Sequence, residues 1–278
     1  MTRSAISSQP LPELLEQLRA KGVRQGVGPM AGETAERATP GVRGAISSGF
    51  PALDTALRTD GWPRGALALL DAPRGTGATS LVIRSLAAAQ EAGGIVAWID
   101  AAGCLDPATV ERMGVNLEWL LVVRPASVAE AVELAGWIVR GGLVDAVALD
   151  LGESGAALTG ELDRLGRLLA RGRAVTLLLA GERLRSAAAP VASVRIALRR
   201  EAWLAVGRDL VGQRVRATVT RHRWALAGAD ATLDLWFGEG RRIDPLLPAL
   251  AVPDETAGTA TGEAEEAGER PALRVLSA

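Results

Sequence analysis

The segment Ala72–Thr79 reads Ala-Pro-Arg-Gly-Thr-Gly-Ala-Thr and carries the residues best placed to do chemistry. It follows the short apolar run Ala66–Leu70 and precedes a stretch typical of a helix. A glycine-rich turn between a strand and a helix binds phosphate, because its amide groups and the helix N-terminus point at the anion. The sequence therefore predicts a phosphate site at this turn.

This turn departs from the phosphate-loop pattern G-x-x-x-x-G-K-[ST] at two of its fixed positions. Gly77 and the Mg²⁺-binding hydroxyl of Thr79 are kept, but Ala72 replaces the first glycine and Ala78 occupies the lysine position. All 31 basic residues except Lys21 are arginine, so no lysine of the core can substitute. Losing a charge-assisted phosphate contact costs about 2 kcal/mol or more. We expect weak or no ATP binding.

Two charged side chains complete this candidate nucleotide site. Arg74 supplies positive charge, but from a different position on the turn. Asp150 ends the apolar run 144–150, where an acid linked to Mg²⁺ would stand. The alternative for Asp150 is an ordinary carboxylate at the end of a strand.

Composition excludes several classes of site. The chain has 278 residues, 48% of them hydrophobic, and a net charge of −1, so no global positive field attracts nucleic acid. Cys104 and His222 are the only residues of their types, which excludes disulfides and clustered metal sites and fits a reducing compartment. We expect no bound metal, no leader, no membrane span and a cytoplasmic protein. We expect His222 on a strand surface.

The pattern from residue 45 to about 248 predicts an α/β domain. Continuous apolar strands separated by helices indicate a mostly parallel sheet covered on both faces. The expected strands are Ala66–Leu70, Ile95–Ile99, Leu120–Val123, Val144–Leu151 and Ala174–Ala180, with helices over 78–92, 127–139 and 158–170. Four further strands follow, antiparallel at one edge: Val194–Arg199, Trp203–Val206, Arg214–Arg221 and Thr232–Phe237.

Two flanking segments surround this core, which we place at residues 45–250. Residues 1–44 hold a short helix over 11–21 and a linker; the apolar stripe of the helix is Leu11, Leu14, Leu15 and Leu18. This stripe packs on the protein's own core or docks on a partner. Residues 251–278 are polar and acidic, which predicts a disordered tail. Leu273 and Leu276 close that tail and are either without function or a docking peptide.

Several motifs in order resemble the RecA recombinase family over roughly residues 45–245. They are the run 46–57, the segment Gly61-Trp-Pro-Arg-Gly65, the segment from Trp98 to Pro107, and the pair of stretches 216–223 and 229–240. The resemblance implies a RecA-like P-loop NTPase core with antiparallel strands at its C-terminal edge.

The resemblance also shows which parts of the family's ATP chemistry are missing. The family's catalytic glutamate falls on Ala102, its lysine on Ala78 and its adenine-stacking tyrosine near Thr109, while Asp106 beside the base remains. Phosphate charge, general base and base stacking are therefore all lost. This combination implies a pseudo-ATPase with no catalytic residues and no nucleotide cofactor.

The segments matching the family's DNA-binding loops are short. They are Gly152–Gly160 and Gly181–Ser193; the second contains Arg183 and Arg185 as its only basic residues, and no aromatic residue. Binding of single strands needs a basic groove with stacking aromatics. We expect weak or no intrinsic DNA binding.

Arg221 and Arg223 match two family lysines that reach the ATP of a neighbouring subunit. They are either a solvated strand end or a surface that completes or caps the ATP site of an active recombinase.

The run Trp62-Pro-Arg-Gly-Ala-Leu67 is similar to the ImuA branch of the family. This resemblance implies a non-catalytic adaptor in SOS-induced translesion synthesis that binds RecA and ImuB, and indirectly an error-prone DnaE-type polymerase, and that reaches the nucleoid through them. The alternatives are an ATP-binding recombinase that uses Arg74, a mediator acting on single-stranded DNA through Arg183 and Arg185, and a SulA-like inhibitor of cell division.

Overall fold

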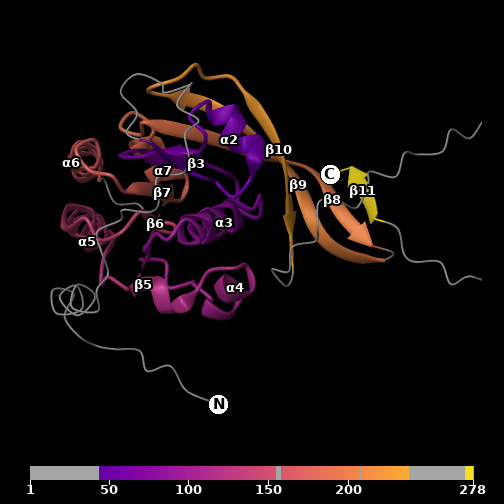
Figure 1. Cartoon of the computed structure of the whole chain (residues 1–278), viewed down its shortest axis with the longest axis horizontal. Coiled ribbons are helices and arrows are strands. Elements are labelled where there is room, and N and C mark those ends of the chain that lie inside the picture. Colours follow the sequence, from indigo (N-terminus) through magenta and orange to yellow (C-terminus); the bar gives the residue numbers. More distant parts are fainter. Residues whose placement is uncertain (1–43, 155–157, 207, 238–272, 278) are drawn as a thin grey trace, which may run out of the picture.

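The computed structural model describes residues 44–154, 158–206, 208–237 and 273–277 (Figure 1). Its helices are α2 (Pro51–Leu57), α3 (Ala78–Glu91), α4 (Pro107–Arg112), the 3₁₀ helix Leu117–Trp119, α5 (Val128–Gly141), α6 (Thr159–Leu169) and α7 (Glu182–Ala188). Its strands are β1 (Ala45–Ile46), β2 (Trp62–Pro63), β3 (Leu67–Asp71), β4 (Val96–Asp100), β5 (Leu120–Val123), β6 (Ala146–Asp150), β7 (Val175–Leu179), β8 (Val194–Val206), β9 (Asp209–His222), β10 (Asp230–Trp236) and β11 (Leu273–Ser277).

The main sheet has the order β10-β9-β8-β3-β7-β6-β4-β5. Every neighbouring pair from β5 to β8 is parallel, whereas β8–β9 and β9–β10 are antiparallel. The predicted fold class, a mostly parallel sheet with antiparallel strands at the C-terminal edge, is confirmed. The carboxyl ends of β3, β4, β6 and β7 meet at one edge, where ligands bind in such sheets.

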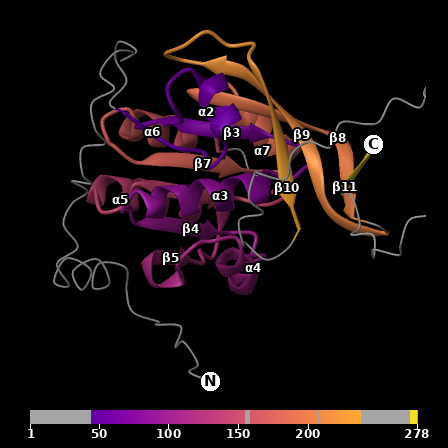
Figure 2. The same ribbon diagram turned by 45° about the vertical axis from the view of Figure 1, so that its right-hand side comes forward.

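Helices cover both faces of the sheet (Figures 1 and 2). One apolar cluster joins the sheet to α2, α3 and α4 and buries Trp62 and Trp98. The second joins the opposite face to α5, α6 and α7. Because each central strand is buried on both faces, β3, β4, β6 and β7 are almost entirely apolar; β3, β4 and β6 each end in an aspartate, and β7 has one buried polar residue, Thr176.

The helix limits follow from local chemistry. Ser127 begins α5, where its hydroxyl accepts a hydrogen bond from the Glu130 amide at 3.1 Å. Asp106 begins α4 in the same way, with Pro107 at the first helical position. Gly142 ends α5 in the left-handed conformation, at φ 68°.

Two expectations for the second half of the core are wrong. The segments 194–199 and 203–206 are one strand, β8, rather than two. Glu201, between the two expected strands, forms an ion pair with Arg216 of β9, and β8 pairs with β9 along its length. In addition, 182–188 is helix α7 rather than a loop, and it covers the sheet through the buried Leu184.

The C-terminal flank also differs from expectation in part. Residues Leu273–Ser277 form β11, which pairs antiparallel with residues 202–206 of β8 (Figure 1). Because β3 pairs with β8 only as far as Ala197, the rest of that edge of β8 is left to accept another strand. Leu273 and Leu276 are therefore part of the chain's own sheet. The rest of the predicted tail and the predicted helix with Leu14, Leu15 and Leu18 lie outside the described residues.

No helix in the described part of the chain is long and apolar enough to cross a membrane.

Candidate functional site

The predicted phosphate loop lies between β3 and α3, at the carboxyl edge of the sheet. Gly75 and Gly77 take left-handed conformations, with φ of 75° and 85°, and α3 begins directly after Gly77. The Thr76 hydroxyl donates to the Pro73 carbonyl at 2.6 Å and closes the turn. The strand, turn and helix therefore occur where the sequence predicts them.

The lysine position of this loop is apolar. Ala78 is partly buried and packs against the core on the α3 side of the sheet, and Thr79 is exposed. Lys21, the only lysine of the chain, lies outside the described residues. Among the described residues, positive charge at the loop therefore comes from arginine.

Four arginines surround the loop, and each is bound to a group of its own chain. Arg74 pairs with Glu153 at 3.2 Å, where both side chains are more than half exposed. Arg200 donates to the Gly75 carbonyl at 2.6 Å. Arg185 and Arg195 share the carboxylate of Asp71, at the end of β3, and Arg185 also donates to the Ala72 carbonyl.

The antiparallel strands press directly on the loop. Arg200 of β8 donates to the Gln213 side chain at 2.8 Å, and its guanidinium lies 4.1 Å from the ring centre of Trp203. A Cβ atom at Gly77 would lie 2.1 Å from Cδ1 of Leu235 and 2.8 Å from Nε2 of Gln213. The end of the loop is therefore packed against β9 and β10.

The acidic side of the site consists of Asp150 and Asp100, which are register partners on β6 and β4. Burial, followed by the nearby charge of Asp100, raises the pKa of Asp150, although its carboxylate accepts a hydrogen bond from the Gly152 amide at 3.1 Å. Asp100 is buried and accepts from the Cys104 and Leu105 amides at 3.1 and 3.2 Å. Asp100 thus shapes the turn after β4.

Two positions singled out from the resemblance face this turn. Ala102 lies against Gly152, whose added Cβ would stand 3.0 Å from the Ala102 methyl group. Asp106 is the N-cap of α4, and the Thr109 hydroxyl donates to it at 2.6 Å. That hydrogen bond, with the amides of Ala108 and Thr109 and the charge of Arg112, lowers the pKa of Asp106. The Asp106 carboxylate therefore caps α4 and is occupied by that helix.

The structure separates Arg221 and Arg223 from the loop. Arg221 lies near the carboxyl end of β9 as the register partner of Arg195, and Arg223 follows that strand, whereas the loop glycine Gly75 contacts Arg200 further along β8. Arg221 donates to the Ala189 and Pro190 carbonyls after α7, at 3.0 and 2.8 Å. Arg223 lies 5.8 Å from the ring centre of Trp224. His222 between them is buried rather than on the surface, and this burial lowers its pKa.

The expected DNA-contact residues differ in their surroundings. Arg185 is held by Asp71 and the loop carbonyl, whereas Arg183 is exposed on α7. Residues 155–157 of the first predicted DNA segment lie outside the described residues. Among the residues that the structure describes, no group of three or more histidine, cysteine or acidic residues is arranged to hold a metal ion.

Sequence reasoning missed the groups that hold the loop. Asp71, Arg195, Arg200 and Gln213 were not singled out, because the contacts of Arg195 with Asp71 and of Arg200 with Gly75 join segments more than 120 residues apart along the chain. The available signal was Asp71 after a buried strand, together with the arginines in and directly after the expected strand 194–199.

The chain matches the family model described as the RecA N-terminal domain over residues 33–187, more than half of its length. A RecA protein from Rubrobacter xylanophilus is 33% identical over 70% of this chain and 67% of its own length. A RecA protein from Corynebacterium efficiens is 32% identical over 74% of this chain and 62% of its own length. The chain therefore belongs to the RecA family and spans about two thirds of the length of these relatives.

Proposed function

We propose that this chain is a RecA-family protein without ATPase activity that acts as an adaptor in SOS-induced translesion DNA synthesis. In this role, which the resemblance to the ImuA branch suggests, it joins RecA filaments and ImuB to an error-prone DnaE-type polymerase. The observation that carries the proposal is a RecA-like core fold in which Ala78 stands at the lysine position of the loop.

The surroundings of the loop support the absence of hydrolysis. Phosphoryl transfer depends on positive charge at the β- and γ-phosphates and on a group that orients the attacking water. Ala78 offers no charge, and Ala102 offers no carboxylate at the position of the family's glutamate. Arg185 and Arg200 donate hydrogen bonds to loop carbonyls, so their guanidinium groups are engaged by the protein's own backbone.

The active-enzyme alternative depends on Arg74. Its ion pair with Glu153 is solvated and contributes about 1 kcal/mol at most, so a bound nucleotide could displace Glu153. Saturable binding of a fluorescent ATP analogue that disappears in Arg74→Ala would favour this alternative. Arg183→Ala, which removes an exposed arginine from α7, is the matched control.

Hydrolysis itself is the first test. Release of phosphate from radiolabelled ATP should equal that of the Asp150→Ala variant, with and without single-stranded DNA. Phosphate release well above that variant would refute the proposal, because Asp150 is the one retained acid at the Mg²⁺ position.

Co-sedimentation tests the adaptor role. The chain is spun with RecA filaments on single-stranded DNA and a non-hydrolysable ATP analogue, and in parallel with DNA alone. We expect pelleting only with RecA, and less of it for Arg223→Ala than for Arg183→Ala. Arg223 is the better variant because Arg221 holds the end of α7. Pelleting with DNA alone, lost in Arg183→Ala, would point to a mediator that binds single strands.

A further inference from the structure

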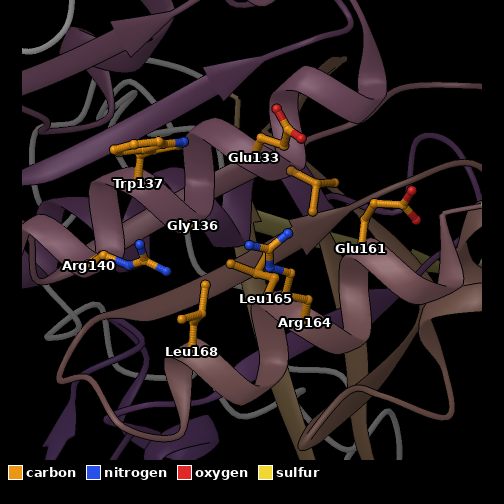
Figure 3. A pocket seen from close by; sticks show the side chains of 9 residues that line it. Glu133, Gly136, Trp137, Arg140, Glu161, Arg164, Leu165 and Leu168 are labelled. Atoms are coloured by element: carbon orange, nitrogen blue, oxygen red, sulfur yellow. The ribbon is translucent and has the colours of Figure 1, made fainter.

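A groove of about 270 Å³ runs between α5 and α6, on the face of the sheet away from α3 (Figure 3). Its apolar floor and wall contain Leu165, Leu168 and Trp137. The Trp137 side chain is 65% exposed, the second-highest value among the exposed large apolar residues of the described chain. A large aromatic side chain held in the open beside leucines is the chemistry of an anchor site for another apolar segment.

Gly136 shapes this groove. A Cβ atom at this position would lie 3.4 Å from Cδ1 of Leu168, so the missing side chain lets α6 approach and leaves space above the two helices. α5 and α6 are in direct contact and cover the same sheet face. The groove is therefore a fixed feature of two packed helices.

The charges along the groove are arranged by sign. Glu133 and Glu161 stand in the first halves of α5 and α6, whereas Arg140 stands at the end of α5 and Arg164 lies between (Figure 3). Within the described part of the chain, no hydrogen bond or ion pair engages any of these four side chains. One end of the groove is thus acidic and the other basic, and both are open to a charged ligand.

We propose that this groove is the docking site of the chain's own segment Leu11–Lys21. As a helix, this segment presents the leucine stripe Leu11, Leu14, Leu15 and Leu18 along one face. Its acidic residues, Glu13 and Glu16, come before its basic residues, Arg19 and Lys21. A helix antiparallel to α5 places the leucines on Trp137, its acidic half at Arg140 and its basic half at Glu133.

The lengths agree with this arrangement. Eleven helical residues span about 16 Å, and the groove residues from Glu133 to Arg140 span about 10 Å of α5. Residues 22–43 connect the segment to the first described residue, Gly44, and reach about 70 Å when extended. A domain of this size has a radius of gyration of about 16 Å, so the segment reaches the groove of its own chain.

The exposure of Trp137 tests the proposal in the full-length protein. The chain is labelled with fluorotryptophan, the Trp137 resonance is assigned with Trp137→Phe, and a soluble paramagnetic agent reports its exposure by fluorine NMR. We expect Leu14→Asp/Leu18→Asp to increase the relaxation of Trp137 about twofold or more, because the anchor returns to solvent. Gln17→Asp/Ala20→Asp, which adds the same two negative charges outside the leucine stripe, is the matched control. Equal exposure in the two variants would overturn the proposal.

Charge reversal tests the orientation. Arg140→Glu should expose Trp137, and adding Glu13→Arg with Glu16→Arg should restore its protection, because the signs are exchanged together. Failure of this rescue would overturn the antiparallel arrangement.

Dilution tests the source of the segment: protection within one chain is independent of protein concentration. Protection that falls on dilution would mean that a second copy supplies the helix and would overturn docking within one chain.

Discussion

The phosphate loop and the α5–α6 groove use charge in opposite ways. At the loop, the arginines of β8 and α7 form hydrogen bonds and ion pairs with carbonyls and carboxylates of their own chain. In the groove, four charged side chains and Trp137 stand open beside leucines. The arginines around the loop are thus engaged in internal bonds, whereas the charged side chains of the groove have no partner among the described residues and lie on a helical face that the family's motifs do not mark. The retained motif therefore does not mark the part of the described surface where charged side chains lack internal partners.

Replacing glycine by alanine should lower the free energy of unfolding at the loop and raise it in the groove. The larger effect is at the loop. Gly77→Ala forces a left-handed alanine against Leu235 and Gln213, so we expect a loss of about 2–4 kcal/mol in the free energy of unfolding. Gly93→Ala has a similar φ of 81° and open space, and should cost only about 1 kcal/mol. Urea denaturation measures both. Equal losses would mean that β9 and β10 do not press on the loop.

The next largest effect concerns the arginine clamp on the loop. Arg200→Met removes the hydrogen bonds to Gly75 and Gln213 and the contact with Trp203, which should cost about 1–2 kcal/mol. Arg199→Met is the matched control: its side chain is 76% exposed and its ion pair is weak, so we expect a change within about 0.5 kcal/mol. Chemical denaturation of both variants checks the difference. A neutral Arg200→Met would show that the loop holds its shape alone.

The parallel half of the fold could be predicted because each of its elements is encoded locally. Buried strands are continuous apolar runs, and Ser127 or Asp106 precedes the helix that it caps. The antiparallel half is different, since its limits depend on cross-strand partners. The sequence predicts two strands, 194–199 and 203–206, but Glu201 between them forms an ion pair with Arg216 of β9 and β8 continues through both.

The candidate site could be predicted only in outline. The loop, Ala78 and Asp150 were found because they are local departures from a known pattern. Arg200 and Asp71 were missed because their roles arise from contacts between segments more than a hundred residues apart. The role expected for Asp106 beside a base is also reduced, since its carboxylate is taken up by Thr109.

A smaller effect of opposite sign is expected in the groove. Gly136→Ala should stabilise the protein by about 0.5–1 kcal/mol, because alanine favours the helix interior and Leu168 meets the new methyl group with the flexible end of its side chain. Gly141→Ala, at the end of α5 with open space around it, separates the helix-propensity gain from packing. Thermal and urea unfolding should agree. A loss at Gly136 would mean that the helices cannot adjust and that the groove is as tightly packed as the loop.

The smallest effect is the pH dependence of stability that Asp150 causes. It tests whether the buried carboxylate of Asp150 destabilises the folded state at neutral pH. Burial raises the pKa of Asp150 above its ordinary value, so the folded state binds this proton more tightly than the unfolded state does. The resulting stability is fully present below the ordinary value of 3.8 and is lost as pH rises through the folded value. Asp150→Asn should therefore be more stable than the natural chain at neutral pH, and this difference should vanish on acidification.

Asp106→Asn provides the opposite case: the lowered pKa of Asp106 means that its carboxylate stabilises the fold at neutral pH. Unfolding curves from pH 7 to 3.5 measure the change in stability that each variant causes. A change of the same sign in both variants at neutral pH would contradict the opposite pKa directions of the two carboxylates.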